Sequence, residues 1–302
     1  MAENKKILIL VANSTYYPSN LMTPLIIKTW GKDPRVKTLI YQGDSEERYH
    51  DENKIYLTSS NEFNSASKRT LEVLKYSLEN IDFDYLLRVT TTTYINIENL
   101  ILFLRNKEPK NLFCGVSDFY PPFDTDEKKI RFISGAGFIL SKDLVKLTVD
   151  NSNNFDFSFN LDDVSIGKLL INELGIETQE GYRQDFYNRL PINRDIDINN
   201  YHYRFKLTVS HHPRYLEAVV LVLLHFKFEK KFYESYIWKL IFDILDLILL
   251  IVFGIIRLLN PHYLLSIFRS SIVIINKLFV KIIKSNNVTH SISKFVKRIL
   301  GF

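Results

Sequence analysis

Short apolar runs that alternate with amphipathic stretches fill about residues 5–210, and they constrain this chain more than any other feature. The first run, Ile7–Val11, suits a buried strand and is too short for a membrane anchor. Strands that alternate with helices form α/β domains, because each helix carries the chain back across a mainly parallel sheet. We therefore predict that fold class. The predicted strands are Ile7–Ala12, Val36–Gln42, Lys54–Leu57, Tyr85–Val89, Leu112–Val116 and Phe132–Leu140.

Polar residues at the starts of the intervening stretches predict where the helices begin. An N-cap side chain satisfies a backbone N–H that the helix leaves free, and small polar residues are preferred there. The predicted caps are Ser19, Ser65, Asn96 and Ser141. The first helix ends near Trp30, where Gly31 follows it. A later helix is predicted over Leu161–Leu174, before Gly175.

The composition narrows the class of protein further. A chain of 302 residues allows one substantial core and an appendage. Its single cysteine, Cys114, excludes an internal disulfide and a cysteine-rich zinc site, and its apolar neighbours predict an inert buried thiol. The first residues do not have the pattern of a signal peptide. We therefore expect the protein to lie on the cytosolic side of a membrane, as a peripheral or monotopic protein.

The membrane expectation comes from the tail. After Asp246 the sequence has no acidic residue, whereas it carries Arg257, Arg269, Lys277, Lys281, Lys284, Lys294, Lys297 and Arg298. Tyr236–Leu259 is strongly apolar, but Asp243 and Asp246 oppose a full crossing of the bilayer. Basic amphipathic helices suit the surface of an anionic membrane, and the apolar setting favours lipid over nucleic acid. The alternative is a helical subdomain that packs on the rest of the protein.

These patterns divide the chain into three regions. We predict an α/β domain over residues 1–212, a connecting helix that packs on it over residues 213–232, and membrane-associated amphipathic helices over residues 233–302.

Four short segments follow one another along the predicted domain. They read IKTWG at Ile27–Gly31, LRVTTTTYIN at Leu87–Asn96, SGAGFILS at Ser134–Ser141 and LDDVSIG at Leu161–Gly167. Their order, spacing and residue types resemble the fringe and beta-1,3-glycosyltransferase group, family 31 of the glycosyltransferases. The resemblance implies a GT-A-like fold. It also implies an inverting hexosyltransferase, which moves a sugar from a nucleotide-sugar donor to a glycan or glycolipid acceptor.

One departure from the family pattern concerns the metal. The family has a metal-binding aspartate triplet where this chain has Thr90, Thr91 and Thr92. Mg²⁺ and Mn²⁺ prefer carboxylate oxygens, whereas neutral hydroxyls can donate hydrogen bonds to phosphate or sugar oxygens. We therefore predict that these threonines bind the donor and that no metal is held by them. A divalent ion elsewhere in the site is left open. The alternative is that the threonines only extend a β-strand, which their propensity favours.

Without that metal, cations must offset the negative charge of the departing diphosphate. The run Tyr201–Lys206 alternates aromatic and basic residues, and it places His202, Arg204 and Lys206 on one side of a strand. The resemblance implies a histidine near this point, which His202 matches. An ordinary edge strand would alternate in the same way. The other candidate cations are Lys28, Arg88 and Arg183.

Inverting sugar transfer also needs a carboxylate that takes the proton of the attacking hydroxyl. The resemblance implies that Asp163 is this base and that Asp162 is the acid preceding it. The alternative is that the two aspartates cap the helix, since negative charge is favoured at its start. The helix dipole there lowers a carboxylate's pKa, whereas a base works best near the operating pH.

The acceptor side is implied by the third segment. Gly135 and Gly137 lack side chains where the backbone must approach a ligand, and Ala136 lies between them. Asp118, in a predicted loop over Ser117–Pro122, is a further candidate for sugar contact. Two alternatives to an active enzyme remain. One is an inactive member that binds carbohydrate or nucleotide as a partner protein, and the other is a membrane-tethered binding protein unrelated to sugars.

Overall fold

The computed structural model describes residues 5–14, 16–120, 129–187, 196–207 and 214–228, and five residues between 251 and 259. The chain divides into two compact units, Met1–Leu207 with Arg214–Leu247, and Thr208–Pro213 with Ile248–Phe302. All helices and strands named below belong to the first unit. The predicted tail helices lie almost wholly outside the described residues. Within the described part, no helix is both long and apolar enough to cross a bilayer.

Strands alternate with helices in the first unit. The strands are β1 (Ile7–Ala12), β2 (Lys37–Gln42), β3 (Tyr49–His50), β4 (Lys54–Tyr56), β5 (Tyr85–Thr90), β6 (Thr93–Ile95), β7 (Phe113–Tyr120), β8 (Ile130–Ser141), β9 (Thr178–Glu180), β10 (Gln184–Tyr187) and β11 (His202–Lys206). The longer helices are α1 (Ser19–Lys28), α2 (Ala66–Asn80), α3 (Ile97–Arg105), α4 (Lys142–Asp150), α5 (Asp162–Gly167) and α6 (Leu216–Phe228). Short 3-10 turns are η1 (Trp30–Lys32), η2 (Phe63–Ser65) and η3 (Ser152–Asn154), and η4 (Lys168–Glu173) is a π-helical continuation of α5.

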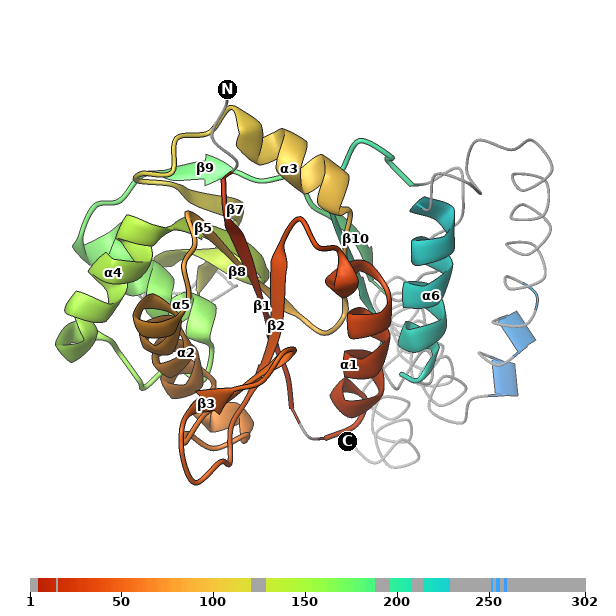
Figure 1. Ribbon diagram of the computed structural model, residues 1–302, viewed down its shortest axis with the longest axis horizontal. Helices are drawn as coiled ribbons and strands as arrows, with labels where there is room; N and C mark the ends of the chain where they lie inside the picture. Colours follow the sequence, from red (N-terminus) through yellow and green to blue (C-terminus); the bar gives the residue numbers. More distant parts are fainter. Residues whose placement is uncertain are drawn as a thin grey trace, which may run out of the picture. The chain divides into compact units, whose positions relative to one another are not determined.

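Eight strands form the central sheet, in the order β3-β4-β2-β1-β5-β8-β7-β9 (Figure 1). Four of its seven pairings are parallel, among them those of β1 with β2 and with β5. The antiparallel strand β8 lies between β5 and β7. The sheet is thus mixed and mainly parallel with flanking helices, and the predicted fold class is confirmed.

Both faces of this sheet are buried. In β1, Ile7, Ile9 and Val11 belong to a core shared with α1, α3 and α6. Leu8 and Leu10 belong to a second core shared with α2, α4 and α5. Successive side chains of a strand point to opposite faces, so a strand covered on both sides is apolar throughout. Figure 1 shows α1 and α6 on one side of the sheet and α2, α4 and α5 on the other.

A second, three-stranded sheet has the order β10-β11-β6. β11 is its central strand, because it pairs in parallel with β10 and antiparallel with β6. The alternative that Tyr201–Lys206 is an ordinary edge strand is therefore wrong. Tyr203 and Phe205 are buried in the core that contains α6, which leaves His202, Arg204 and Lys206 on the opposite face.

Some predicted boundaries are corrected by the structure. β7 continues through Ser117–Tyr120, where a loop was predicted, because a register shift after Gly115 lets it pair with Ile130–Ile133 of β8. The helix predicted over Leu161–Leu174 is α5 followed by the π-helical η4. Helix α6 lies in the predicted connecting segment, while the three-region division itself stays a prediction.

Cys114 is buried, and burial raises the pKa of its thiol to about 12, as expected for an inert cysteine.

Of the four predicted caps, only Asn96 makes a capping hydrogen bond. Its side-chain oxygen accepts from the backbone N–H of Asn99 at 3.2 Å. Ser65 precedes α2 without such a bond, and Ser19 is already inside α1. Ser141 is at the N-cap position of α4, but its hydroxyl accepts from the N–H of Leu112, the residue before β7, at 2.9 Å.

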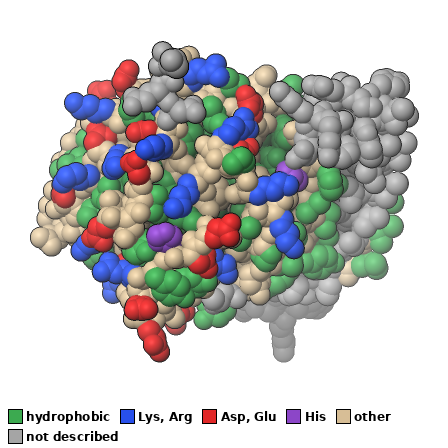
Figure 2. All heavy atoms as spheres, viewed as in Figure 1, with side chains coloured by type: hydrophobic (Ala, Val, Ile, Leu, Met, Phe, Trp, Pro, Cys, Tyr) green, Lys and Arg blue, Asp and Glu red, His purple; other side chains and the backbone are tan. Residues whose placement is uncertain are grey.

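Acidic and basic side chains are interspersed on the face of the described body that Figure 2 shows. The positive excess of the sequence, +5, does not gather into a basic patch on this face.

The difference between Asn96 and Ser65 is testable. We expect Asn96→Ala to lower the free energy of unfolding by about 1 kcal/mol, the usual effect of removing an N-cap. Ser65→Ala is the matched control and should change it little, because its hydroxyl makes no capping bond. Urea denaturation of both variants measures this. Equal losses would show that both serine and asparagine cap their helices.

Candidate active site

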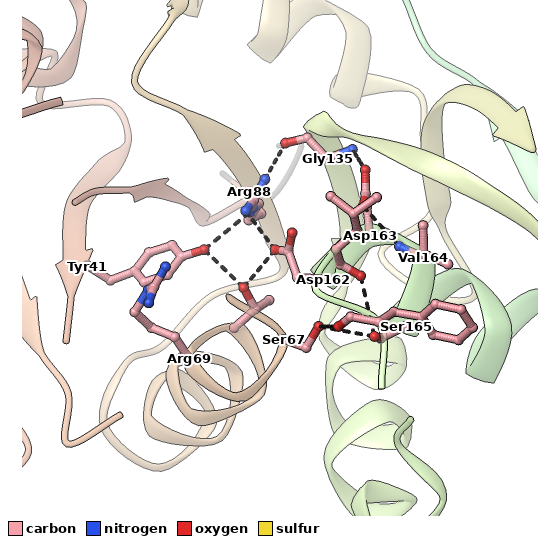
Figure 3. A network of polar contacts seen from close by, with 12 residues as sticks. Tyr41, Ser67, Arg69, Arg88, Gly135, Asp162, Asp163, Val164 and Ser165 are labelled. Atoms are coloured by element: carbon pink, nitrogen blue, oxygen red, sulfur yellow. Dashed lines mark hydrogen bonds and ion pairs between the residues drawn. The ribbon is translucent and has the colours of Figure 1, made fainter. Parts of the chain in front are cut away.

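A buried ion pair between Arg88 and Asp162 lies at the centre of the candidate site (Figure 3). Arg88 Nη2 is 2.6 Å from Asp162 Oδ2, and their side chains are only 7% and 8% exposed. Arg88 Nε donates to the hydroxyl of Tyr41 at 3.2 Å, and Nη1 donates to the carbonyl of Gly135. The hydroxyl of Thr70 donates to the same Asp162 oxygen at 2.7 Å. Each of the three nitrogens of Arg88 therefore has a partner within the protein, and contact of Arg88 with a donor stays a prediction.

Four elements bring this network together. β5 carries Arg88, β2 carries Tyr41, α2 carries Thr70, and α5 begins with Asp162. β1 lies between β2 and β5, so Arg88 reaches past a central strand to Tyr41. The guanidinium also lies 5.9 Å from the ring centre of Phe138 on β8, within range of a cation–π contact.

Asp163 lies beside this pair and is held by backbone groups. Its Oδ2 accepts from the N–H of Gly135 at 2.6 Å, and its Oδ1 accepts from the N–H of Val164 at 3.0 Å. Burial raises the pKa of Asp163 to about 6, and the charge of Asp162 adds to the increase. The two backbone hydrogen bonds and Arg88 oppose it. The backbone at the helix end does lower this pKa, as expected, but burial outweighs it and the net change is an increase.

The arrangement argues against the capping alternative. The N-cap of α5 is Leu161, which has no side-chain cap bond. Asp162 is committed to Arg88 and Thr70, and Asp163 reaches across to Gly135 on β8. The two carboxylates thus join α5 to the central sheet.

The glycines of β8 make room for neighbouring side chains of the same chain. A Cβ atom at Gly135 would lie 2.8 Å from Oδ2 of Asp163, and one at Gly137 would overlap the ring of His202. Ala136, between them, is buried. The close approach expected at these glycines therefore occurs, with protein groups as the partners. Contact of Gly135, Ala136 and Gly137 with an acceptor stays a prediction.

The threonine segment forms a turn. β5 ends at Thr90 and β6 begins at Thr93, so Thr91 and Thr92 connect two strands of different sheets. The alternative of one extended strand is wrong. The hydroxyl of Thr90 lies 3.3 Å from that of Thr92 and 3.4 Å from that of Thr93. Among the described residues, no group of three His, Cys, Asp or Glu side chains is placed to hold a metal ion.

The basic strand β11 lies directly beside this turn. Arg204 is opposite Thr93 in the ladder, and the N–H of Phe205 donates to the carbonyl of Thr92 at 3.0 Å. Arg183 immediately precedes β10. Because Gln184 of β10 pairs with Tyr203 of β11, Arg183 lies next to His202. Burial and the charges of Arg183 and Arg204 hold the pKa of His202 well below its ordinary value, so the ring is neutral.

Two predicted site residues are not brought to this region. Lys28 lies in the last turn of α1. It is about 14 Å further along this helix than Ser19, whose hydroxyl is 3.4 Å from that of Thr91. Asp118 is opposite Phe132, so it is three residues, or about 10 Å, from Gly135 along β8.

Three residues of the site were missed by the sequence analysis. Tyr41 and Thr70 share a hydrogen bond at 3.1 Å and both contact the central ion pair. Asp185 pairs with both Arg183 and Arg204. Only the place of Tyr41 at the end of an apolar strand was a usable signal, because no motif surrounds Thr70 or Asp185.

The central pair should have a measurable effect on stability. We expect Arg88→Met to lower the free energy of unfolding by about 3–5 kcal/mol, because Asp162 would stay buried without its partner. Adding Asp162→Leu should recover part of the loss. Lys146→Met, in the exposed pair with Asp150, is the control and should have little effect. Denaturant titration tests this, and a small loss in Arg88→Met would contradict the central role of the pair.

Comparison with known proteins identifies the family. The family model described as Galactosyltransferase matches residues 25–181, slightly more than half of the chain. The matched region contains all four segments, the threonine turn and both site aspartates, whereas Arg183 and β11 lie beyond it. No curated protein sequence matches the chain significantly.

Two solved structures are similar at low identity. One is a glycosyltransferase involved in the glycosylation of the major capsid of PBCV-1, with 11% identity and a TM-score of 0.42, over 72% of this chain and 98% of that chain. The other is the 4-diphosphocytidyl-2C-methyl-D-erythritol synthase of Anaerococcus prevotii DSM 20548, with 14% identity and a TM-score of 0.39, over 59% and 87%. These values support no argument about the site. The family match, in contrast, covers more than half of the chain, from α1 to β9, and the chain therefore belongs to the galactosyltransferase family.

Proposed function

We propose that this family member is an inverting glycosyltransferase, which moves a sugar from a nucleotide-sugar donor to a glycan or glycolipid acceptor. The observation that carries the proposal is the state of Asp163. Its carboxylate is half-buried, is oriented by two backbone N–H groups and has a pKa raised to about 6. A base is most effective when its pKa lies near the operating pH, which this value satisfies better than that of an ordinary aspartate.

The proposed reaction is a single displacement. The acceptor hydroxyl gives its proton to Asp163 while its oxygen forms a bond to the anomeric carbon of the donor sugar. The bond from that carbon to the diphosphate breaks on the opposite side, and the nucleoside diphosphate leaves with the electron pair. One displacement inverts the anomeric configuration. Each carboxylate oxygen of Asp163 accepts one hydrogen bond and has a second lone pair for the acceptor.

The neighbouring groups are assigned by their chemistry. We assign Thr90, Thr91 and Thr92 to the donor side, together with the basic residues of β11. We assign the Gly135–Gly137 stretch of β8 to the acceptor side, next to Asp163. Arg88 and Asp162 hold Asp163 in place, because the pair fixes both the start of α5 and the carbonyl of Gly135.

Replacement of the base tests the mechanism. We expect Asp163→Asn to lower turnover by about 10²-fold or more and to leave nucleotide-sugar binding nearly unchanged. Activity of the unaltered protein should fall as the pH drops below about 6, because protonation removes the base, and the residual activity of Asp163→Asn should lack this fall. Steady-state rates against pH measure both effects. Asp150→Asn, on an exposed helix position, is the control.

Two outcomes would contradict the proposal. Near-normal turnover in Asp163→Asn would exclude this residue as the base. Nucleotide-sugar binding by the unaltered protein, with neither transfer nor hydrolysis for any donor in a screen, would favour the inactive partner protein instead.

We also propose that the enzyme works on the cytosolic surface of an anionic membrane. The support is the sequence of the tail, which combines apolar runs with eight basic residues and has no acid after Asp246. On the face of the described body that Figure 2 shows, acidic and basic side chains are interspersed, so this face should attract anionic lipid less than the tail does.

Vesicle flotation of the full chain tests the membrane proposal. We expect binding to vesicles with anionic lipid to exceed binding to neutral vesicles. Replacing Lys277, Lys281 and Lys284 by Gln should weaken binding about 100-fold, since each contributes about 1 kcal/mol near an anionic surface. The same change at Lys37, Lys68 and Lys75, which are exposed on the body, is the control. Equal binding by both variants would contradict the proposal.

A further inference from the structure

Three buried nitrogens in one cluster have no hydrogen-bond partner among the described residues. They are Nη1 of Arg183, Nε2 of His202 and Nε of Arg204. The side chain of Arg183 is 8% exposed, and His202 is 2% exposed. An unpaired buried polar group destabilises the folded protein, and a charged one does so more strongly. Three such groups side by side therefore indicate a missing partner.

The charge of the cluster indicates what kind of partner is missing. Arg183 and Arg204 share one carboxylate, Asp185, with closest distances of 2.9 Å and 3.7 Å. Lys206 lies on the same face of β11 and forms no ion pair among the described residues. Burial and the charges of Arg204 and Arg214 lower the pKa of Lys206, and Glu217 opposes the change. The contacts thus leave an excess of positive charge, which an anion would balance.

The position of the cluster connects it with the rest of the site. β11 places Arg204 opposite Thr93 of the threonine turn, and the ring of His202 lies against Gly137 of β8. The charge of Asp163 also acts on Arg204, where it favours the protonated guanidinium. The cations, the threonine turn and the proposed base therefore meet in one region.

We propose that Arg183, His202 and Arg204 bind the diphosphate of the donor directly, without a divalent metal. This inference rests on the proposed function for the identity of the anion. An arginine presents a fork of N–H donors that fits phosphate oxygens, and a neutral histidine adds one N–H donor. Positive charge at this point offsets the negative charge that develops on the leaving diphosphate. The three residues lie beyond residues 25–181, so the family match does not assign them.

The inference predicts that pyrophosphate binds in the absence of metal. Calorimetric titration of the full chain with inorganic pyrophosphate in excess EDTA should show binding, and added Mg²⁺ should not strengthen it. Arg204→Gln and Arg183→Gln should each weaken binding about 10- to 100-fold, the usual effect of losing a charge-assisted hydrogen bond. Arg35→Gln is the matched control, because this exposed arginine has its own partners, Asp33 and Glu98.

Arg204→Lys keeps the experiment decisive if the glutamine variants fold poorly. It retains the charge and loses the fork, and Arg204 is partly exposed, so it should fold and bind pyrophosphate about 10-fold less tightly. Absence of pyrophosphate binding, binding that EDTA abolishes, or unchanged binding in Arg204→Lys would overturn the inference. Metal-independent binding without sugar transfer would contradict the proposed function alone. EDTA-resistant transfer that Arg204→Lys and Arg204→Gln leave unchanged would contradict the anion site alone.

Discussion

The site depends on the charge balance between Arg88 and Asp162. Neither side chain could be buried alone, because an uncompensated charge in the interior is strongly destabilising. Their pairing joins β5 to α5, and the remaining donors of Arg88 fix Tyr41 and Gly135. Asp163 follows directly in the chain, so its place is set by this pair and by Gly135. Burial then raises its pKa, and the charge of Asp162 adds to this.

The sequence predicted the parts of this structure that depend on local pattern. The apolar runs predicted the bounds of β1, β2, β4, β5 and β8 to within two residues. Asn96 was correctly predicted as a cap, and its partner, Asn99, is only three residues away in the sequence. Ser65 and Ser141 occupy the predicted N-cap positions of α2 and α4 without a capping bond, and Ser141 bonds instead to Leu112, a residue 29 positions away. The extension of β7 failed because it depends on a register shift against β8.

The same distinction separates the site residues. The family resemblance pointed to Asp162 and Asp163, and the structure placed them beside Arg88 and Gly135. Arg88 was expected to bind the donor, and nothing local shows that its nitrogens also contact Asp162, Tyr41 and a carbonyl. Thr70 and Asp185 were missed for the same reason. Their importance arises from partners on other elements, which pattern alone does not reveal.

The second sheet has a consequence for where this protein can be divided. β6 lies within the region shared with the family, but its ladder partner β11 and the next strand, β10, lie beyond residue 181. A fragment that ended there would leave β6 as an unpaired edge and uncover the core that Tyr203, Phe205 and α6 complete. The limit of family similarity is therefore not the limit of the folding unit, and a shortened protein must retain the chain through α6 to keep this sheet and core complete.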